Sequence, residues 1–158
     1  MDTRVIVSSA LVIFHLDNQT YALALDAVER VLPMLAWASL PQGPAIALGV
    51  INLHGSILPV VDIRRRFGRP ERSYGVAGHL LIARTRQRRL ALPVDEVVGV
   101  REISLRTVTP AAAVLPGLAH VKGLVSLDDG VLFIHDLDSF LSLEEESALD
   151  AALEKAGT

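Results

Sequence analysis

The sequence predicts a mainly β protein, built from two small barrels that pack together and end in one short helix. Three observations lead to this prediction. Short apolar segments, several with alternating large and small side chains, recur along the chain and end at turn-forming clusters. These segments fall into two similar series, one in each half of the chain. Helical periodicity occurs only near the C-terminus.

The first half contains two expected hairpins. Residues 5–16 are rich in aliphatic and β-branched side chains and end at the turn-forming cluster Asp17–Gln19. The next strand starts at Tyr21 and alternates with period two. A loop with three prolines, residues 33–44, precedes the second hairpin over residues 49–63.

The second half repeats this order. Residues 79–103 are typical of a strand, a polar turn and another strand, and a second proline-containing loop over residues 104–117 follows. Residues 120–141 then form another expected hairpin. A short amphipathic helix is expected over residues 143–155, started by a capping box in which Ser142 precedes Glu145 by three positions.

The two halves can be aligned without gaps. Residues 49–63 match 123–137, and residues 21–31 match 90–100. The identical pairs include Gly49 with Gly123, Asp62 with Asp136 and Asp26 with Asp95. We therefore expect residues 1–158 to form a single domain of two similar subdomains, with an approximate internal repeat of 21–63 with 90–137. Each unit holds four or five short strands, and so small a sheet protects its edges best by closing into a barrel.

Composition excludes several classes of function. The absence of cysteine rules out disulfides, thiol nucleophiles and thiolate metal sites. A net charge of −3 and few aromatic residues argue against a nucleic-acid-binding role. No apolar run is long enough for a membrane-spanning helix, and the N-terminal apolar segment lacks a preceding basic region. A cytoplasmic location without membrane insertion is expected.

No pattern of residues indicates catalysis. The five histidines lie more than four positions apart, there is no nucleophile elbow, and no phosphate-binding loop is present. We therefore expect neither an enzyme nor a bound cofactor or metal. The basic runs Arg64–Arg66 and Arg84–Arg89 are interpreted as solvated strand ends and turns, with a surface for an acidic protein or nucleic acid as the alternative.

Four segments of the sequence resemble a known protein family. The stretch GVINLHGSILPVVDIRRRFG, residues 49–68, and the preceding FHLDNQTYALALDAVERVL, residues 14–32, resemble the N-terminal half of the CheW-like chemotaxis coupling proteins. The segments LALPVDEVVGVREI and VKGLVSLDDGVLFIHDLDSFLS are similar to the blocks of that family's second half. The likeness extends over about residues 10–155.

The resemblance implies two five-stranded SH3-like β-barrels and a C-terminal helix. It implies a non-enzymatic adaptor in bacterial chemotaxis that couples the cytoplasmic tip of a chemoreceptor to the regulatory domain of a CheA-type histidine kinase. The alternative is a CheW-like regulatory scaffold for another signalling or motility pathway, with an altered partner preference. A third hypothesis is an enzyme or small-molecule site that uses His54 and Asp62 in the groove between the barrels.

The resemblance also implies a partner-binding site. His54 stands where the family usually has arginine, and Arg30 stands where an acidic residue is common. These two residues cannot reproduce an ion pair between an acid and an arginine, which predicts a changed partner preference or, as the alternative, a poorly coupling relative. The partner-binding residues expected from the motif are Val28, Arg30, Asn52, Leu53, His54 and Gly55.

Overall fold

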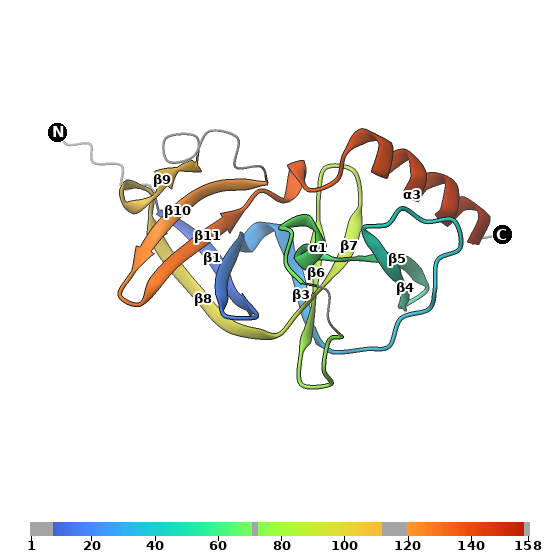
Figure 1. The fold of residues 1–158 in the computed structure, drawn as a ribbon, viewed down its shortest axis with the longest axis horizontal. Coiled ribbons are helices and arrows are strands. Elements are labelled where there is room, and N and C mark those ends of the chain that lie inside the picture. The colour runs from blue at the N-terminus through green and yellow to red at the C-terminus, as the bar shows by residue number, and fades with distance from the viewer. Residues whose placement is uncertain (1–7, 71–72, 112–119, 157–158) are drawn as a thin grey trace.

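The computed structural model describes residues 8–70, 73–111 and 120–156. Their strands form a six-stranded sheet in the order β8-β1-β2-β11-β10-β9 and a five-stranded sheet in the order β3-β6-β7-β5-β4 (Figure 1). The predicted fold class is confirmed. The sixth strand, β9, is a two-residue strand in the proline-containing loop, and the part of that loop over residues 112–119 lies outside the described residues.

The hairpins expected over residues 49–63 and 120–141 are present, whereas the second strand expected within residues 79–103 divides into β7 and β8, which belong to different sheets. The six-stranded sheet contains β1 (Ser8–Leu16), β2 (Gln19–Ala24), β8 (Glu96–Ser104), β9 (Thr109–Pro110), β10 (Val121–Leu127) and β11 (Gly130–His135). The five-stranded sheet contains β3 (Val28–Pro33), β4 (Ala47–Leu53), β5 (Ser56–Val61), β6 (His79–Arg84) and β7 (Arg89–Val94). The helical elements are η1 (Leu25–Ala27), α1 (Ile63–Arg66), η2 (Leu105–Thr107), η3 (Leu137–Ser139) and α3 (Leu143–Ala156).

The chain crosses between the sheets twice before it reaches α3. It leaves the six-stranded sheet after β2, passes through η1 and enters β3; it returns at Asp95, between β7 and β8. As a result, the β1–β2 hairpin pairs with strands from the second half of the chain, and the β6–β7 hairpin pairs with strands from the first half. Each sheet therefore contains strands from both halves.

Matching irregularities support the proposed internal repeat. The pairing of β4 with β5 shifts register between Ala47 and Gly49, and that of β10 with β11 shifts between Val121 and Gly123. A Cβ atom on Gly49 would lie 2.2 Å from a backbone oxygen of the passing loop, and one on Gly123 would lie 2.6 Å from Val108. Glycine thus allows the same close approach of another chain segment in both hairpins. The repeat remains a proposal on these grounds.

The main hydrophobic core lies between the sheets and is shared by them. It combines Phe14 and Tyr21 of the six-stranded sheet with Leu81 and Leu92 of the five-stranded sheet, and Leu149 of α3 packs into the same cluster. Burial of this apolar surface is the principal force that holds the sheets together.

A buried arginine crosses this interface. Arg64, in α1, is 1% exposed, and its Nη2 donates to Asp95 Oδ1 at 2.5 Å. Its Nε lies 3.5 Å from Asp17 Oδ1, and its guanidinium carbon lies 4.1 Å from the centre of the Tyr74 ring. Asp17 follows β1 and Asp95 precedes β8, so one guanidinium links the end of β5 to two segments of the other sheet.

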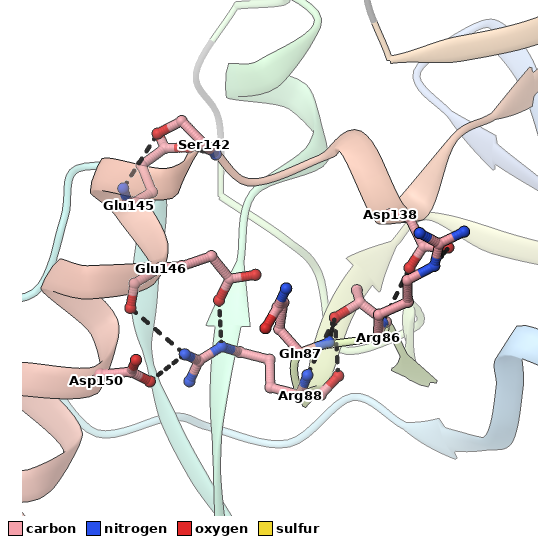
Figure 2. Close-up of polar contacts among 9 residues, drawn as sticks. Arg86, Gln87, Arg88, Asp138, Ser142, Glu145, Glu146 and Asp150 are labelled. Carbon is pink, nitrogen blue, oxygen red and sulfur yellow. Dashed lines mark hydrogen bonds and ion pairs between the residues drawn. The ribbon is translucent and has the colours of Figure 1, made fainter.

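Two other arginines bind the C-terminal helix, and Figure 2 shows the contacts of one of them, Arg88. Arg88, in the β6–β7 turn, donates from Nε to Glu146 Oε1 at 2.6 Å and also binds Asp150. Arg66 Nη2 lies 2.5 Å from Glu145 Oε2. The predicted capping box is confirmed, because Glu145 N donates to the hydroxyl of Ser142 while the Glu145 carboxylate accepts from Ser142 N.

These contacts correct the interpretation of the two basic runs. They were expected to be solvated, but Arg64 is buried, and Arg66 and Arg88 hold α3. Arg84 and Arg89 share the carboxylate of Glu29. The arginines satisfy acidic groups that lie far away in the sequence, a relation that local sequence patterns do not reveal.

Replacement of Arg64 by leucine is expected to destabilise the protein by about 3 kcal/mol. This is the lower end of the cost of breaking a buried ion pair, because the carboxylates of Asp17 and Asp95 keep some contact with solvent. Urea unfolding measures the effect. The matched control is Arg101→Leu, since Arg101 is exposed and its side chain makes no hydrogen bond or ion pair with the described residues. Equal stability of the two variants would contradict the assignment.

Another buried titratable group is His135. Its ring packs between Phe67 and Phe140, with both centroid separations at 5.1 Å, and neither ring nitrogen has a hydrogen-bond partner in the described structure. Burial, followed by the nearby cations His120, Lys122 and Arg66, lowers the pKa of His135 to about 3. The imidazole is therefore neutral at physiological pH.

This lowered pKa predicts acid sensitivity. Between pH 6.5 and 3 the unfolded chain binds a proton at His135 that the folded chain does not, so the free energy of unfolding falls as the pH is lowered. The expected contribution is a loss of about 2 kcal/mol between pH 7 and pH 5. A His135→Leu variant should lose this component, seen as a shallower dependence of urea-unfolding free energy on pH. Identical slopes for the two proteins would refute the prediction.

Candidate partner-binding site

The turn between β4 and β5 is built by its own residues. His54 has φ 51° and Gly55 has φ 90°, so both central residues lie in the left-handed region that a tight two-residue hairpin turn requires. Asn52 Oδ1 accepts a hydrogen bond from Gly55 N at 2.8 Å. Asn52 and Gly55 thus shape the turn, and His54 is presented at its tip.

Two of the predicted site residues belong to the interior. Leu53 is buried in a cluster with Ile51 and Leu58 inside the five-stranded sheet. Val28 is half-buried and packs against the main core. Their exposure to a partner is therefore small, and both keep the strands that carry the site in position.

The remaining two predicted residues meet each other. Nη1 of Arg30 lies 3.0 Å from Nε2 of His54, and both side chains are exposed. Because arginine has no acceptor, the contact requires a neutral imidazole whose Nε2 accepts the hydrogen bond. The contact joins a cation to a neutral acceptor. It is therefore not an ion pair between an acid and an arginine.

The Arg30–His54 contact also joins two distant edges of one sheet. Arg30 is in β3 and His54 follows β4, and these strands are the two outer members of the five-stranded order. The sheet therefore curls until its edges approach, as expected for a small barrel. The site lies where the barrel closes, so its shape depends on closure.

Four apolar residues of β3, β5 and β8 are exposed, and sequence reasoning missed them. Val31 of β3 is 43% exposed and Ile57 of β5 is 44% exposed. On the other sheet, Val98 and Val100 of β8 are more than half exposed. Their apolar character alone predicted burial. The edge positions of β3 and β8 leave Val31, Val98 and Val100 at the surface, whereas Ile57 lies on the inner strand β5.

The hypothesis of a ligand site that combines His54 with Asp62 finds no geometric support. Asp62 is buried and accepts hydrogen bonds from Arg64 N and from the Tyr74 hydroxyl. Burial, followed by the Asp62 carboxylate, raises the pKa of Tyr74, so this hydroxyl stays a donor. The structure brings His54 to Arg30, whereas Asp62 caps α1.

The described residues contain neither a metal-binding cluster nor a membrane-spanning helix. Within ranges 8–70, 73–111 and 120–156, no group of three or more His, Cys, Asp or Glu side chains is arranged to hold a metal ion. In the same ranges, no helix has the length and apolar character needed to cross a membrane.

Comparison with known proteins identifies the family. The CheW-like domain model matches residues 10–145. The chain is 27% identical to a chemotaxis protein CheW of Rhizobium meliloti (strain 1021), over 87% of this chain and 90% of the relative, and 27% identical to that of Klebsiella aerogenes, over 91% and 88%. The crystal structure of the scaffolding protein TtCheW from Thermoanaerobacter tengcongensis is similar, with a TM-score of 0.79, 27% identity, and coverage of 88% and 96%. The chain belongs to the CheW-like domain family.

The turn geometry yields a direct test. Gly55→Ala is expected to cost about 1 kcal/mol of stability, because alanine is strained at φ 90° even though a Cβ atom there would meet open space. Gly75→Ala is the matched control, since that position is equally open and lacks a positive φ. Thermal or urea unfolding measures both variants, and an equal effect would show that the backbone conformation of Gly55 is not the cause.

Proposed function

We propose that this protein is a non-enzymatic chemotaxis scaffold that couples chemoreceptors to a CheA-type histidine kinase. The match of the CheW-like family over residues 10–145 carries this proposal. A relative of known structure is described as a scaffolding protein, and several curated relatives are chemotaxis proteins. The cytoplasm, where receptor tips and such kinases meet, is the proposed location.

The proposed receptor surface is the barrel closure around Arg30 and His54. These two residues supply donors and charge. Val31 follows Arg30 in β3 and Ile57 lies near the start of β5, and both expose apolar area. Specific protein contacts combine apolar area with hydrogen-bonding and charged groups. The surface is held in shape by the other four residues. Asn52 and Gly55 form the turn, and Leu53 and Val28 pack toward the core.

The charge of this surface favours a partner with a carboxylate. Arg30 makes no ion pair with the described residues, and its only hydrogen-bonded partner is a neutral imidazole. Four of its five N–H donors therefore remain for a partner, and a carboxylate is the acceptor that a guanidinium binds most strongly. This supports a partner preference that differs from that of family members with an acidic residue at position 30.

Coupling requires that two partners bind different faces. Because the sheets share one core and Arg64 spans both, a partner that alters the packing of one sheet changes the free energy of the other. A receptor on the barrel closure and a kinase elsewhere would then influence one another without direct contact.

A pull-down tests the scaffold itself. The full chain is mixed with the regulatory domain of a CheA-type kinase and with a receptor tip fragment from the same genome, and both are expected to bind. Arg30→Glu should weaken receptor binding at least tenfold and leave kinase binding intact, whereas Arg106→Glu, an exposed arginine of η2, should change neither. Binding to neither partner would overturn the proposal.

The second candidate is a CheW-like scaffold in another signalling or motility pathway. The Arg30–His54 contact favours it, because the site differs from the family pattern at both positions. His54→Arg combined with Arg30→Glu would restore the usual pair. Gain of binding to receptor fragments that the wild type ignores would support the altered preference, and unchanged binding would count against it.

The apolar flank provides a further test. Val31→Asp places a charge in the proposed interface and is expected to reduce receptor binding at least tenfold with little change in melting temperature. Val76→Asp is the matched control, since Val76 is almost fully exposed in a loop. Binding is measured by calorimetry and melting by circular dichroism. A large loss of melting temperature in Val31→Asp would show that Val31 is structural.

A further inference from the structure

The Arg30–His54 contact at the barrel closure depends on the charge of the histidine. Nη1 of Arg30 lies 3.0 Å from Nε2 of His54. A guanidinium has no acceptor, so Nε2 must accept the hydrogen bond and the proton of the neutral ring must lie on Nδ1. Protonation of the ring turns Nε2 into a second donor and places two cations side by side. The hydrogen bond therefore exists only while His54 is neutral.

Within the described residues, the side chains around this contact offer no acid to balance a second positive charge. β4, β5 and the loop over residues 34–46, which pairs with β4, contain no titratable residue. In β3, the carboxylate of Glu29 is bound by Arg84 and Arg89. β6, which pairs with β3, adds only His79 and Arg84 as titratable residues. A proton on the imidazole therefore adds a charge that no acidic neighbour neutralises.

The turn holds His54 at the barrel closure whatever the charge of its ring. Asn52 Oδ1 accepts a hydrogen bond from Gly55 N, and Leu53 is buried inside the five-stranded sheet. Neither interaction involves the imidazole, so both persist when the ring gains a proton. Loss of the hydrogen bond to Arg30 then changes the charge of this surface and leaves the fold intact.

We propose that Arg30 and His54 form a proton-sensitive pair that sets the charge of the receptor surface, an inference that rests on the proposed function. With His54 neutral, the ring holds Arg30 and the pair carries one positive charge. With His54 protonated, the hydrogen bond is lost and the pair carries two. One carboxylate of an acidic partner can then bind between the two cations. Receptor binding should therefore become tighter as the pH falls through the range in which histidine gains its charge.

The expected change in affinity is modest because both side chains are exposed. Ion pairs at exposed positions strengthen an interaction by no more than about fivefold. From pH 8 to pH 6, the affinity for an acidic receptor fragment is expected to rise about two- to fivefold. Binding that weakens over this interval has the wrong sign for the proposal.

The first measurement uses the isolated full chain and follows the ring nitrogen signals of His54 by nuclear magnetic resonance. At pH 8 the signals are expected to show the tautomer with its proton on Nδ1, because Nε2 accepts from Arg30. Arg30→Met removes the donor and should release the ring to take either tautomer. Arg101→Met is the matched exposed control and should keep the wild-type tautomer. A wild-type ring protonated on Nε2 at pH 8 would overturn the proposal.

The second measurement is calorimetric binding of a receptor tip fragment at pH 8 and pH 6. His54→Gln keeps a neutral acceptor and His54→Arg carries a permanent charge, so both variants should lose the pH-dependent component of the wild type. The affinity of His54→Arg should match that of the protonated wild type. His15→Gln is the matched control in β1 and should keep the wild-type response. Comparison with His54→Gln removes the effect of any titration in the fragment itself.

The outcomes separate this inference from the scaffold function. Equal pH dependence in the wild type and His54→Gln would overturn the proton-sensitive pair and leave the scaffold function intact. Absence of fragment binding at both pH values would contradict the scaffold function instead. In that case a peptide of four glutamates serves as the carboxylate probe, and it should bind the wild type more tightly at pH 6 than at pH 8. No such difference relative to His54→Gln would overturn the inference.

Discussion

The structure depends on one buried charge, the guanidinium of Arg64. Desolvation opposes this charge, but the hydrogen bond to Asp95 and the nearby carboxylate of Asp17 outweigh it and raise the pKa of Arg64. A buried cation is tolerated only while its counter-ions stay in place. The end of β5, the β1–β2 turn and the second crossing must therefore come together in one arrangement, which fixes how the sheets sit on each other.

This internal use of charge determines what the surface can offer a partner. Most arginines of the two basic runs are committed to Asp, Glu or backbone groups within the molecule. Arg30 is different, since its one described contact is with a neutral ring. The exposed cation at the barrel closure thus differs from the arginines of the two basic runs, and a net charge of −3 does not reveal it.

The sequence predicted the strands, the capping box and the class of fold, because alternation, turn residues and caps act over a few positions. It did not predict that the β1–β2 and β6–β7 hairpins pair with the opposite half, since local patterns carry no information about which hairpins pair. For the proposed site, the motif directed attention to the β4–β5 turn and to β3. Burial separates Leu53 and Val28, which pack toward the core, from the four exposed residues. Of these four, Asn52 and Gly55 shape the turn, and Arg30 and His54 contact each other.

The exchange of hairpins between the sheets affects how the protein can fold while it is being synthesised. β1 and β2 emerge first, but their neighbours β8 and β11 are synthesised only after the whole five-stranded sheet has passed. Until then the first hairpin has exposed edges and an uncovered apolar face, a state prone to aggregation. Such long-range pairing folds slowly. The strands of the five-stranded sheet all lie between Val28 and Val94, so this sheet can assemble earlier. The first hairpin can then pack its apolar face against that sheet before β8 and β11 are synthesised.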